Sequence, residues 1–195
     1  SRTSWQQNEA WHKARFSPRC LLRLAANPYL LQIMAVLPVI PASRAQLFQG
    51  FLHVLYAREA QARAARDDPR VPALEAWLEA LAQLAEALQR LGSGEDKHEG
   101  DSGARTALRR AEWPAVLNAE VLDFARDASV LELRGDDLRF THQLLQEYLA
   151  SRLLLEASQG RRPAADFWPA DRWWERSGWE VVAEIAAESC AGDAA

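Results

Sequence analysis

The sequence predicts a mainly α-helical fold, a helical bundle followed by a winged-helix module with one short β-hairpin. Apolar residues recur every three or four positions over residues 47–56 and 74–91, which is the period of an amphipathic helix. Residues 130–140 (VLELRGDDLRF) instead alternate apolar and polar residues around a turn at Gly135-Asp136-Asp137, which predicts a β-hairpin. The amphipathic stretch 142–158 follows, and short helices, a hairpin and a closing helix are the pattern of a winged helix.

Composition indicates a folded chain in a reducing compartment. Of 195 residues, 49% are hydrophobic and 26% charged, which is enough to build a packed core. The net charge of −4 disfavours binding to nucleic acid or to an anionic membrane. The two cysteines, Cys20 and Cys190, are too few for a disulfide framework and favour a cytoplasmic location. The longest apolar run, residues 30–40, is shorter than the roughly 20 residues of a membrane span.

The amino-terminal third predicts two helices. Asn27 suits a helix N-cap and Pro28 the first helical position, where its missing N–H costs nothing. Residues 29–37 are apolar on nearly every side, so we expect this helix to be buried all round. Ser43, with Gln46 three residues later, predicts a capping box for the next helix, which we expect to end around residues 68–69. Ser1 does not resemble a natural start, and we expect the chain to be part of a larger protein.

Turn and cap residues predict the remaining elements of the chain. Residues 92–103 are rich in glycine and charge and predict a mobile linker, and two short helices are expected over 104–112 and 114–127. Thr141 is expected to cap the closing helix. A tryptophan-rich tail then leads into a helix at residues 179–189. We expect its tryptophans to pack on the winged helix; the alternative is a surface for a protein partner.

Two motifs resemble those of NACHT-type STAND NTPases, the group that includes NOD-like receptors. Residues 27–31, Asn-Pro-Tyr-Leu-Leu, are similar to the NPxLL motif at the start of that family's first helical domain. Residues 140–150, FTHQLLQEYLA, are similar to its FxHxxxQEYLAA motif, with Ser151 where the family often has a second alanine. The order of the parts between the motifs also fits.

The resemblance implies a domain plan. Residues 1–68 would be the end of the nucleotide-binding region and the first helical domain, and residues 69–160 the winged-helix domain. Residues 161–195 would begin a C-terminal helical sensor or repeat region. The expected partners are an upstream P-loop domain and the downstream sensor in cis, with other proteins or a second copy of the chain in trans, and no membrane.

The resemblance also implies two nucleotide contacts. ADP or ATP, with Mg in the full-length protein, would bind the upstream domain; Pro28 would pack against the adenine and His142 would reach the phosphates of ADP in the resting form. With Thr141 as N-cap, His142 would lie in the first helical turn, where backbone N–H groups and the helix dipole favour an anion. The alternatives remain a histidine with a purely local hydrogen bond and a proline explained by its place at a helix start.

The chain carries no pattern for chemistry of its own. It has no GxxxxGK[ST], HExxH, CxxC or GxSxG motif, so we assign no catalytic or metal-binding residue and expect no tight nucleotide binding by this segment alone. A nucleotide-independent helical scaffold is the alternative function. A DNA-reading winged helix is the weaker rival, because residues 114–127 carry Glu120, Asp123 and Asp127 against Arg126 only.

Overall fold

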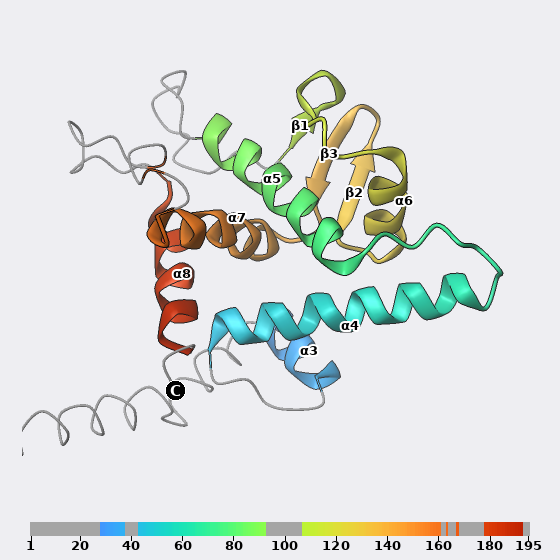
Figure 1. Ribbon diagram of the computed structural model, residues 1–195, viewed down its shortest axis with the longest axis horizontal. Coiled ribbons are helices and arrows are strands. Elements are labelled where there is room, and N and C mark those ends of the chain that lie inside the picture. The colour runs from blue at the N-terminus through green and yellow to red at the C-terminus, as the bar shows by residue number, and fades with distance from the viewer. Residues whose placement is uncertain are drawn as a thin grey trace, which may run out of the picture. The chain divides into compact units, whose positions relative to one another are not determined.

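The computed structural model describes residues 28–37, 43–92, 107–160, 163, 167 and 178–192 (Figure 1). The chain forms two compact units, Ser1–Val54 and Leu55–Ala195, and the division falls inside helix α4 (Arg44–Ala64). The fold is mainly helical with a small antiparallel sheet, as the sequence predicts. No helix in the described ranges is long and apolar enough to cross a membrane.

The first unit holds helix α3 (Pro28–Val36) and the beginning of α4. Pro28 is the first helical residue, as predicted, and Asn27 lies outside the described residues. The ring of Tyr29 meets that of Phe51 edge-on at 6.4 Å between centroids. Gly50 permits a close approach here, because a Cβ on it would lie 3.1 Å from Leu37 Cδ2. Aromatic contact and a glycine together bring α3 against α4.

The prediction that this helix is buried on every side is wrong. Leu30 and Ile33 are buried, but Leu31 and Val36 keep 51% and 53% of their surface exposed. Leu30 and Ile33 are three residues apart and share a face, whereas Leu31 and Val36 lie on others. An apolar sequence therefore buries only the face that meets a neighbour.

Helix α4 begins and ends near the predicted positions. Ser43 Oγ accepts a hydrogen bond from the Gln46 N–H at 3.2 Å, which is the N-capping half of the predicted box. The helix ends at Ala64, and Asp67 then takes a left-handed conformation with φ 55°.

The predicted domain boundaries at residues 68 and 160 stay predictions.

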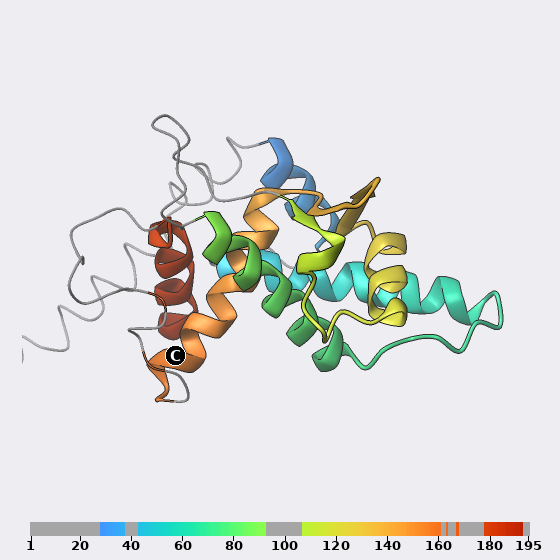
Figure 2. The ribbon, with the colours of Figure 1, turned by 90° about the horizontal axis from the view of Figure 1, so that it is seen from above.

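The elements of the second unit after α4 are, in chain order, α5 (Leu74–Gly92), β1 (Leu108–Arg109), a 3-10 turn η1 (Arg110–Glu112), α6 (Ala119–Asp127), β2 (Leu131–Arg134), β3 (Asp137–Phe140), α7 (Gln143–Ser158) and α8 (Glu180–Gly192). The strands form an antiparallel sheet in the order β1-β3-β2, which with the helices before and after it is the order of a winged helix. Helix α7 packs against both α5 and α8, and Figure 1 shows it between them; Figure 2 gives the view from above.

The predicted hairpin is confirmed as β2 and β3. Leu131 faces Phe140 and Arg134 faces Asp137, so Gly135 and Asp136 form the two-residue turn. Gly135 has φ 61°, a conformation that glycine adopts without the steric cost of a Cβ. The predicted turn includes Asp137, but Asp137 pairs with Arg134 and is the first residue of β3.

The predictions of helices over 104–112 and 114–127 are wrong, the first in type and the second in its start. Residues 104–106 lie outside the described part, and the rest of the first segment is β1 and η1, because Leu108 pairs with Leu138 at the edge of the sheet. The second helix starts only at Ala119, since the Asn118 side chain accepts from the Val121 N–H at 2.9 Å and caps it there. Strand pairing thus replaces the first predicted helix, and the Asn118 cap delays the start of the second.

The core of the second unit is built on aromatic rings and helix faces. Tyr56, Trp77 and Phe124 form a cluster with centroids 5.1 to 5.6 Å apart, joining α4, α5 and α6. Trp179 is 2% exposed and meets Phe167, a residue of the same tail, edge-on at 5.1 Å; the packing of the tail's tryptophans on the winged helix stays a prediction. The predicted linker 92–103 and the tryptophans at 168, 173 and 174 lie outside the described residues, except for Gly92, the last residue of α5.

Candidate functional site

Pro28, the predicted adenine contact, is the exposed first residue of α3 in the Ser1–Val54 unit. Its fixed φ and missing N–H explain its place at a helix start without any ligand. His142, the predicted phosphate contact, belongs to the Leu55–Ala195 unit. The two residues therefore belong to different units.

His142 is itself the N-cap of α7. The helix begins at Gln143, and the His142 Nδ1 accepts a hydrogen bond from the Leu144 N–H at 3.1 Å. The main-chain oxygen of His142 accepts from the Leu145 N–H at 3.0 Å. An imidazole nitrogen thus does here what a serine or aspartate oxygen does at most helix starts.

The prediction that Thr141 caps this helix is wrong, and the reason lies in the hairpin. The Thr141 N–H donates to the Val130 carbonyl at 3.0 Å, and its hydroxyl lies 3.0 Å from the Ser129 carbonyl and 3.3 Å from that of Val130. Thr141 thus ties β3 to the residues just before β2. The N-cap is therefore His142 and not Thr141, because Thr141 still belongs to the contacts of the hairpin.

The electrostatics of His142 follow from its position. The ring is half-buried, and burial lowers the pKa of His142 below the ordinary 6.5, so it is neutral at pH 7. Because Nδ1 accepts from Leu144, the neutral ring carries its proton on Nε2. His142 therefore presents one N–H donor at the positive end of the α7 dipole, a combination suited to an anion.

The glutamine of the QEYLA motif packs rather than reacts. Gln146 is 1% exposed, and its Nε2 donates to Gln89 Oε1 on α5 at 3.3 Å. Gln89 in turn donates to the main-chain oxygen of Gly178, two residues before α8. We name the pair Gln89 and Gln146 the amide relay. It links α5, α7 and the start of α8, and the sequence signals it only as two polar residues at apolar-face positions.

A second buried polar cluster, which the sequence reading missed, centres on Arg63 of α4. Its side chain is 2% exposed and donates to Glu59 at 3.1 Å, to Asp127 at 2.8 Å and to the Arg70 carbonyl at 2.6 Å. The guanidinium also lies over the Phe124 ring at 5.1 Å. With each of its nitrogens bonded, Arg63 is a structural clamp between α4 and α6 and not a reactive group.

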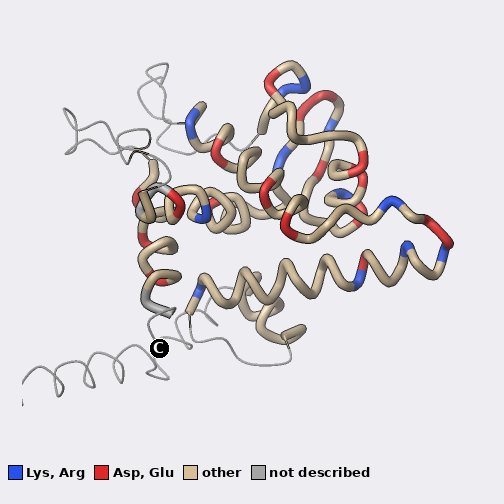
Figure 3. Tube along the Cα trace, in the orientation of Figure 1, with Lys and Arg blue, Asp and Glu red and all other residues tan. Residues whose placement is uncertain are grey.

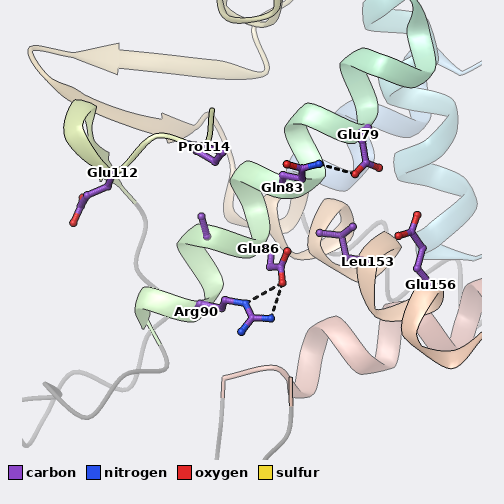
Figure 4. Close-up of a pocket in the computed structure, with 9 residues that line it drawn as sticks. Glu79, Gln83, Glu86, Arg90, Glu112, Pro114, Leu153 and Glu156 are labelled. Carbon is purple, nitrogen blue, oxygen red and sulfur yellow. Dashed lines mark hydrogen bonds and ion pairs between the residues drawn. The ribbon is translucent and has the colours of Figure 1, made fainter. Parts of the chain in front are cut away.

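An open pocket of about 600 Å³ is lined by α5, by α7 and by residues 112 and 114 (Figure 4). Inside it the Glu86 carboxylate is paired with Arg90 at 2.8 Å, and Glu79 accepts from Gln83 at 2.9 Å. Neither predicted ligand residue lines it, and the part of the chain described holds no group of three or more histidine, cysteine or acidic side chains placed to bind a metal. The lining residues are Glu79, Gln83, Glu86, Ala87, Arg90, Glu112, Pro114, Leu153 and Glu156.

Helix α6 carries Glu120, Asp123 and Asp127 but a single basic residue, Arg126. Acidic and basic residues are interspersed along α6 and the hairpin (Figure 3). Arg126 lies 3.9 Å from Asp123, and Asp127 is engaged by Arg63. A helix that reads DNA needs an excess of cationic side chains toward the phosphates, which α6 lacks.

In comparisons with protein families, curated proteins and solved structures, the chain matches none of them. The NACHT resemblance therefore continues to depend on the two motifs, at residues 27–31 and 140–150.

Proposed function

We propose that this chain is the regulatory segment of a NACHT-type STAND NTPase, which clamps bound ADP in the resting state and rearranges when ATP replaces it. In this proposal His142 donates a hydrogen bond to a phosphate of ADP, and Pro28 packs against the adenine. The nucleotide and its Mg are held mainly by an upstream P-loop domain, and the segment performs no catalysis itself.

The observation that carries the proposal is the position of His142 as N-cap of α7. Its Nδ1 is engaged by the Leu144 N–H at 3.1 Å, so the proton stands on Nε2. A donor beside the N-terminus of a 16-residue helix meets two requirements of an anion contact, a hydrogen bond and a favourable dipole. The lowered pKa of His142 keeps this donor neutral, so the contact senses the nucleotide without a change in charge.

A clamp of this kind works only by a difference in affinity between two arrangements. A ligand shifts a conformational equilibrium by no more than its differential binding to the two states. His142 must therefore contact the nucleotide in the ADP-bound form and not in the ATP-bound form. The expected signature is a variant that weakens ADP binding more than ATP binding.

The test is the affinity of the full-length protein for ADP and ATP, measured by isothermal titration with His142→Ser and His142→Ala. Serine keeps an N-cap acceptor for α7 and removes the ring donor, whereas alanine removes both. Loss of a hydrogen bond to a charged phosphate weakens binding by roughly tenfold or more. Both variants should show this loss of ADP affinity.

The matched control is His53→Ala, since His53 is an exposed histidine on α4 outside the proposed contact. It should leave both affinities unchanged. If His142→Ser binds ADP as tightly as the wild-type protein, the phosphate contact is refuted.

A nucleotide-independent helical scaffold is the second candidate. The exposed Leu31 and Val36 on α3 favour it, because apolar side chains on a helix surface suit contacts with another protein. The same titration separates the two functions, since a scaffold predicts that the full-length protein loses no nucleotide affinity on substitution of His142.

A further inference from the structure

We propose that Thr141 is the positioning residue for His142: its hydroxyl fastens the chain before α7 to the turn that ends α6 and so holds the imidazole in its capping orientation. This inference rests on the proposed function, in which the His142 ring meets a phosphate. It concerns how the ring is held, and therefore has a readout that does not require nucleotide.

Thr141 holds the chain on the strand side of His142. Its N–H and hydroxyl make contacts with the carbonyls of Ser129 and Val130 between 3.0 and 3.3 Å. On the helix side the ring is held by the Leu144 N–H at 3.1 Å. His142 is thus held by Thr141, which precedes it, and by Leu144, two residues after it, and the Thr141 hydroxyl is the side-chain part of the attachment on the strand side.

The turn that Thr141 contacts, residues 127–130, is held by hydrogen bonds of its own. Val130 N–H donates to Ala125 O and Ser129 N–H to Arg126 O, both at 2.9 Å, which is the Schellman pattern of a helix C-terminus. Ser129 takes the left-handed position of this motif with φ 63°, where glycine is the usual residue. A conformation unfavourable for serine persists only where its surroundings hold it.

Helix α4 holds the same turn from its other side. Arg58 donates to the Ala128 carbonyl at 3.4 Å, and Arg63 donates to Asp127 at 2.8 Å. The residues from 127 to 130 therefore have contacts with α4 on one side and Thr141 on the other. Through Thr141 and this turn, the His142 ring is therefore connected to α4 and α6 as well as to the hairpin.

The consequence for the ring follows from hydrogen-bond geometry. A cap bond weakens steeply as the donor angle departs from linearity, and a ligand contact loses strength when its donor is displaced by even about 1 Å. Without the Thr141 hydroxyl, the backbone N–H still bonds to Val130 but the side-chain attachment to Ser129 is lost. The ring should then leave the Leu144 N–H for a larger fraction of the time.

The experiment is NMR of the 195-residue chain with 15N-labelled histidine, together with hydrogen exchange of the Leu144 amide. Thr141→Val removes the hydroxyl and keeps the branched shape; Thr141→Ser restores the hydroxyl. In Thr141→Val the Leu144 amide should exchange about fivefold faster, as expected for a lost hydrogen bond. The His142 ring should show a mixture of tautomers, and its pKa should rise toward the ordinary value as the ring reaches water.

The control is Ser151→Ala, which removes a hydroxyl of α7 that donates to Tyr148 O and lies away from the cap. It should leave the His142 signals unchanged, and Thr141→Ser should reproduce the wild-type spectrum. Unchanged His142 signals in Thr141→Val, or an equal change in Ser151→Ala, would overturn the proposal.

Two further outcomes have definite meanings. If Thr141→Val and Thr141→Ala both lose the helical circular dichroism signal, the hydroxyl is needed for folding and the positioning role is refuted. If His142→Ser keeps full ADP affinity in the full-length protein, the phosphate contact fails while the NMR result on Thr141 stands by itself.

Discussion

Replacing Arg63 with methionine should lower the free energy of unfolding of the Leu55–Ala195 unit by about 3 kcal/mol. Methionine matches the length of the arginine stem and can still pack against Phe124, so the loss isolates the guanidinium. Removing one partner of a buried pair costs about 3 to 5 kcal/mol, because the other partner is left charged and desolvated.

The structure places the expected loss at the lower end of that range. The Glu59 side chain is 8% exposed, but it keeps a second arginine, Arg66, at 3.0 Å. Asp127 is 51% exposed and can return to water, so its pair contributes little. The Arg70 carbonyl loses its donor, which adds about 1 kcal/mol.

The assay is urea unfolding followed by circular dichroism, with Arg66→Met as the matched control. Arg66 pairs with the same Glu59 carboxylate, but its side chain is 59% exposed, so its loss should cost no more than about 1 kcal/mol. In the double variant Arg63→Met with Glu59→Met the cost should be smaller than the sum of the two single costs. Equal destabilisation by Arg63→Met and Arg66→Met would refute the reasoning, because burial would then have no effect.

Three further predictions concern His142, the amide relay and the α6 turn. Ser129→Gly should raise stability by about 1 kcal/mol in urea unfolding, because φ 63° costs serine and not glycine; a lower stability would contradict it. Gln146→Leu should cost about 1 to 3 kcal/mol by removing the buried hydrogen bond from Gln146 Nε2 to Gln89 Oε1, and Gln89→Leu in addition should recover part of that loss. Because burial lowers the pKa of His142, the unfolded chain takes up a proton first as pH falls below about 6.5. Stability present above that pH should therefore fall with acidification, less so in His142→Ser, and urea midpoints at about pH 7.5 and 5.5 measure the difference.

Local features of the fold could be predicted because neighbouring residues decide them. The start of α3 at Pro28 follows from the fixed φ of proline, and the cap of α4 by Ser43 follows from a side chain that bonds three residues ahead. The hairpin follows from its alternation and from Gly135, which takes the positive φ of the turn. The sequence alone therefore predicts the fold class correctly.

Features that depend on distant partners could not be predicted. Leu108 is a strand residue because it pairs with Leu138, and nothing within residues 104–112 signals that partner. The amide relay joins Gln146 to a residue on another helix, and buried Arg63 finds partners, Asp127 and the Phe124 ring, more than 60 residues further along the chain. In each case burial or pairing is settled by packing between segments far apart in the chain.

The site shows the same division. The sequence by itself determined that a histidine stands where a strand gives way to a helix, and it suggested an anion contact there through the motif and the helix dipole. Only the tertiary structure decided which residue caps α7, because the Thr141 N–H and hydroxyl are taken by Val130 and Ser129 across the hairpin. That pairing leaves the cap to the His142 ring, and the ring's orientation and tautomer follow from it.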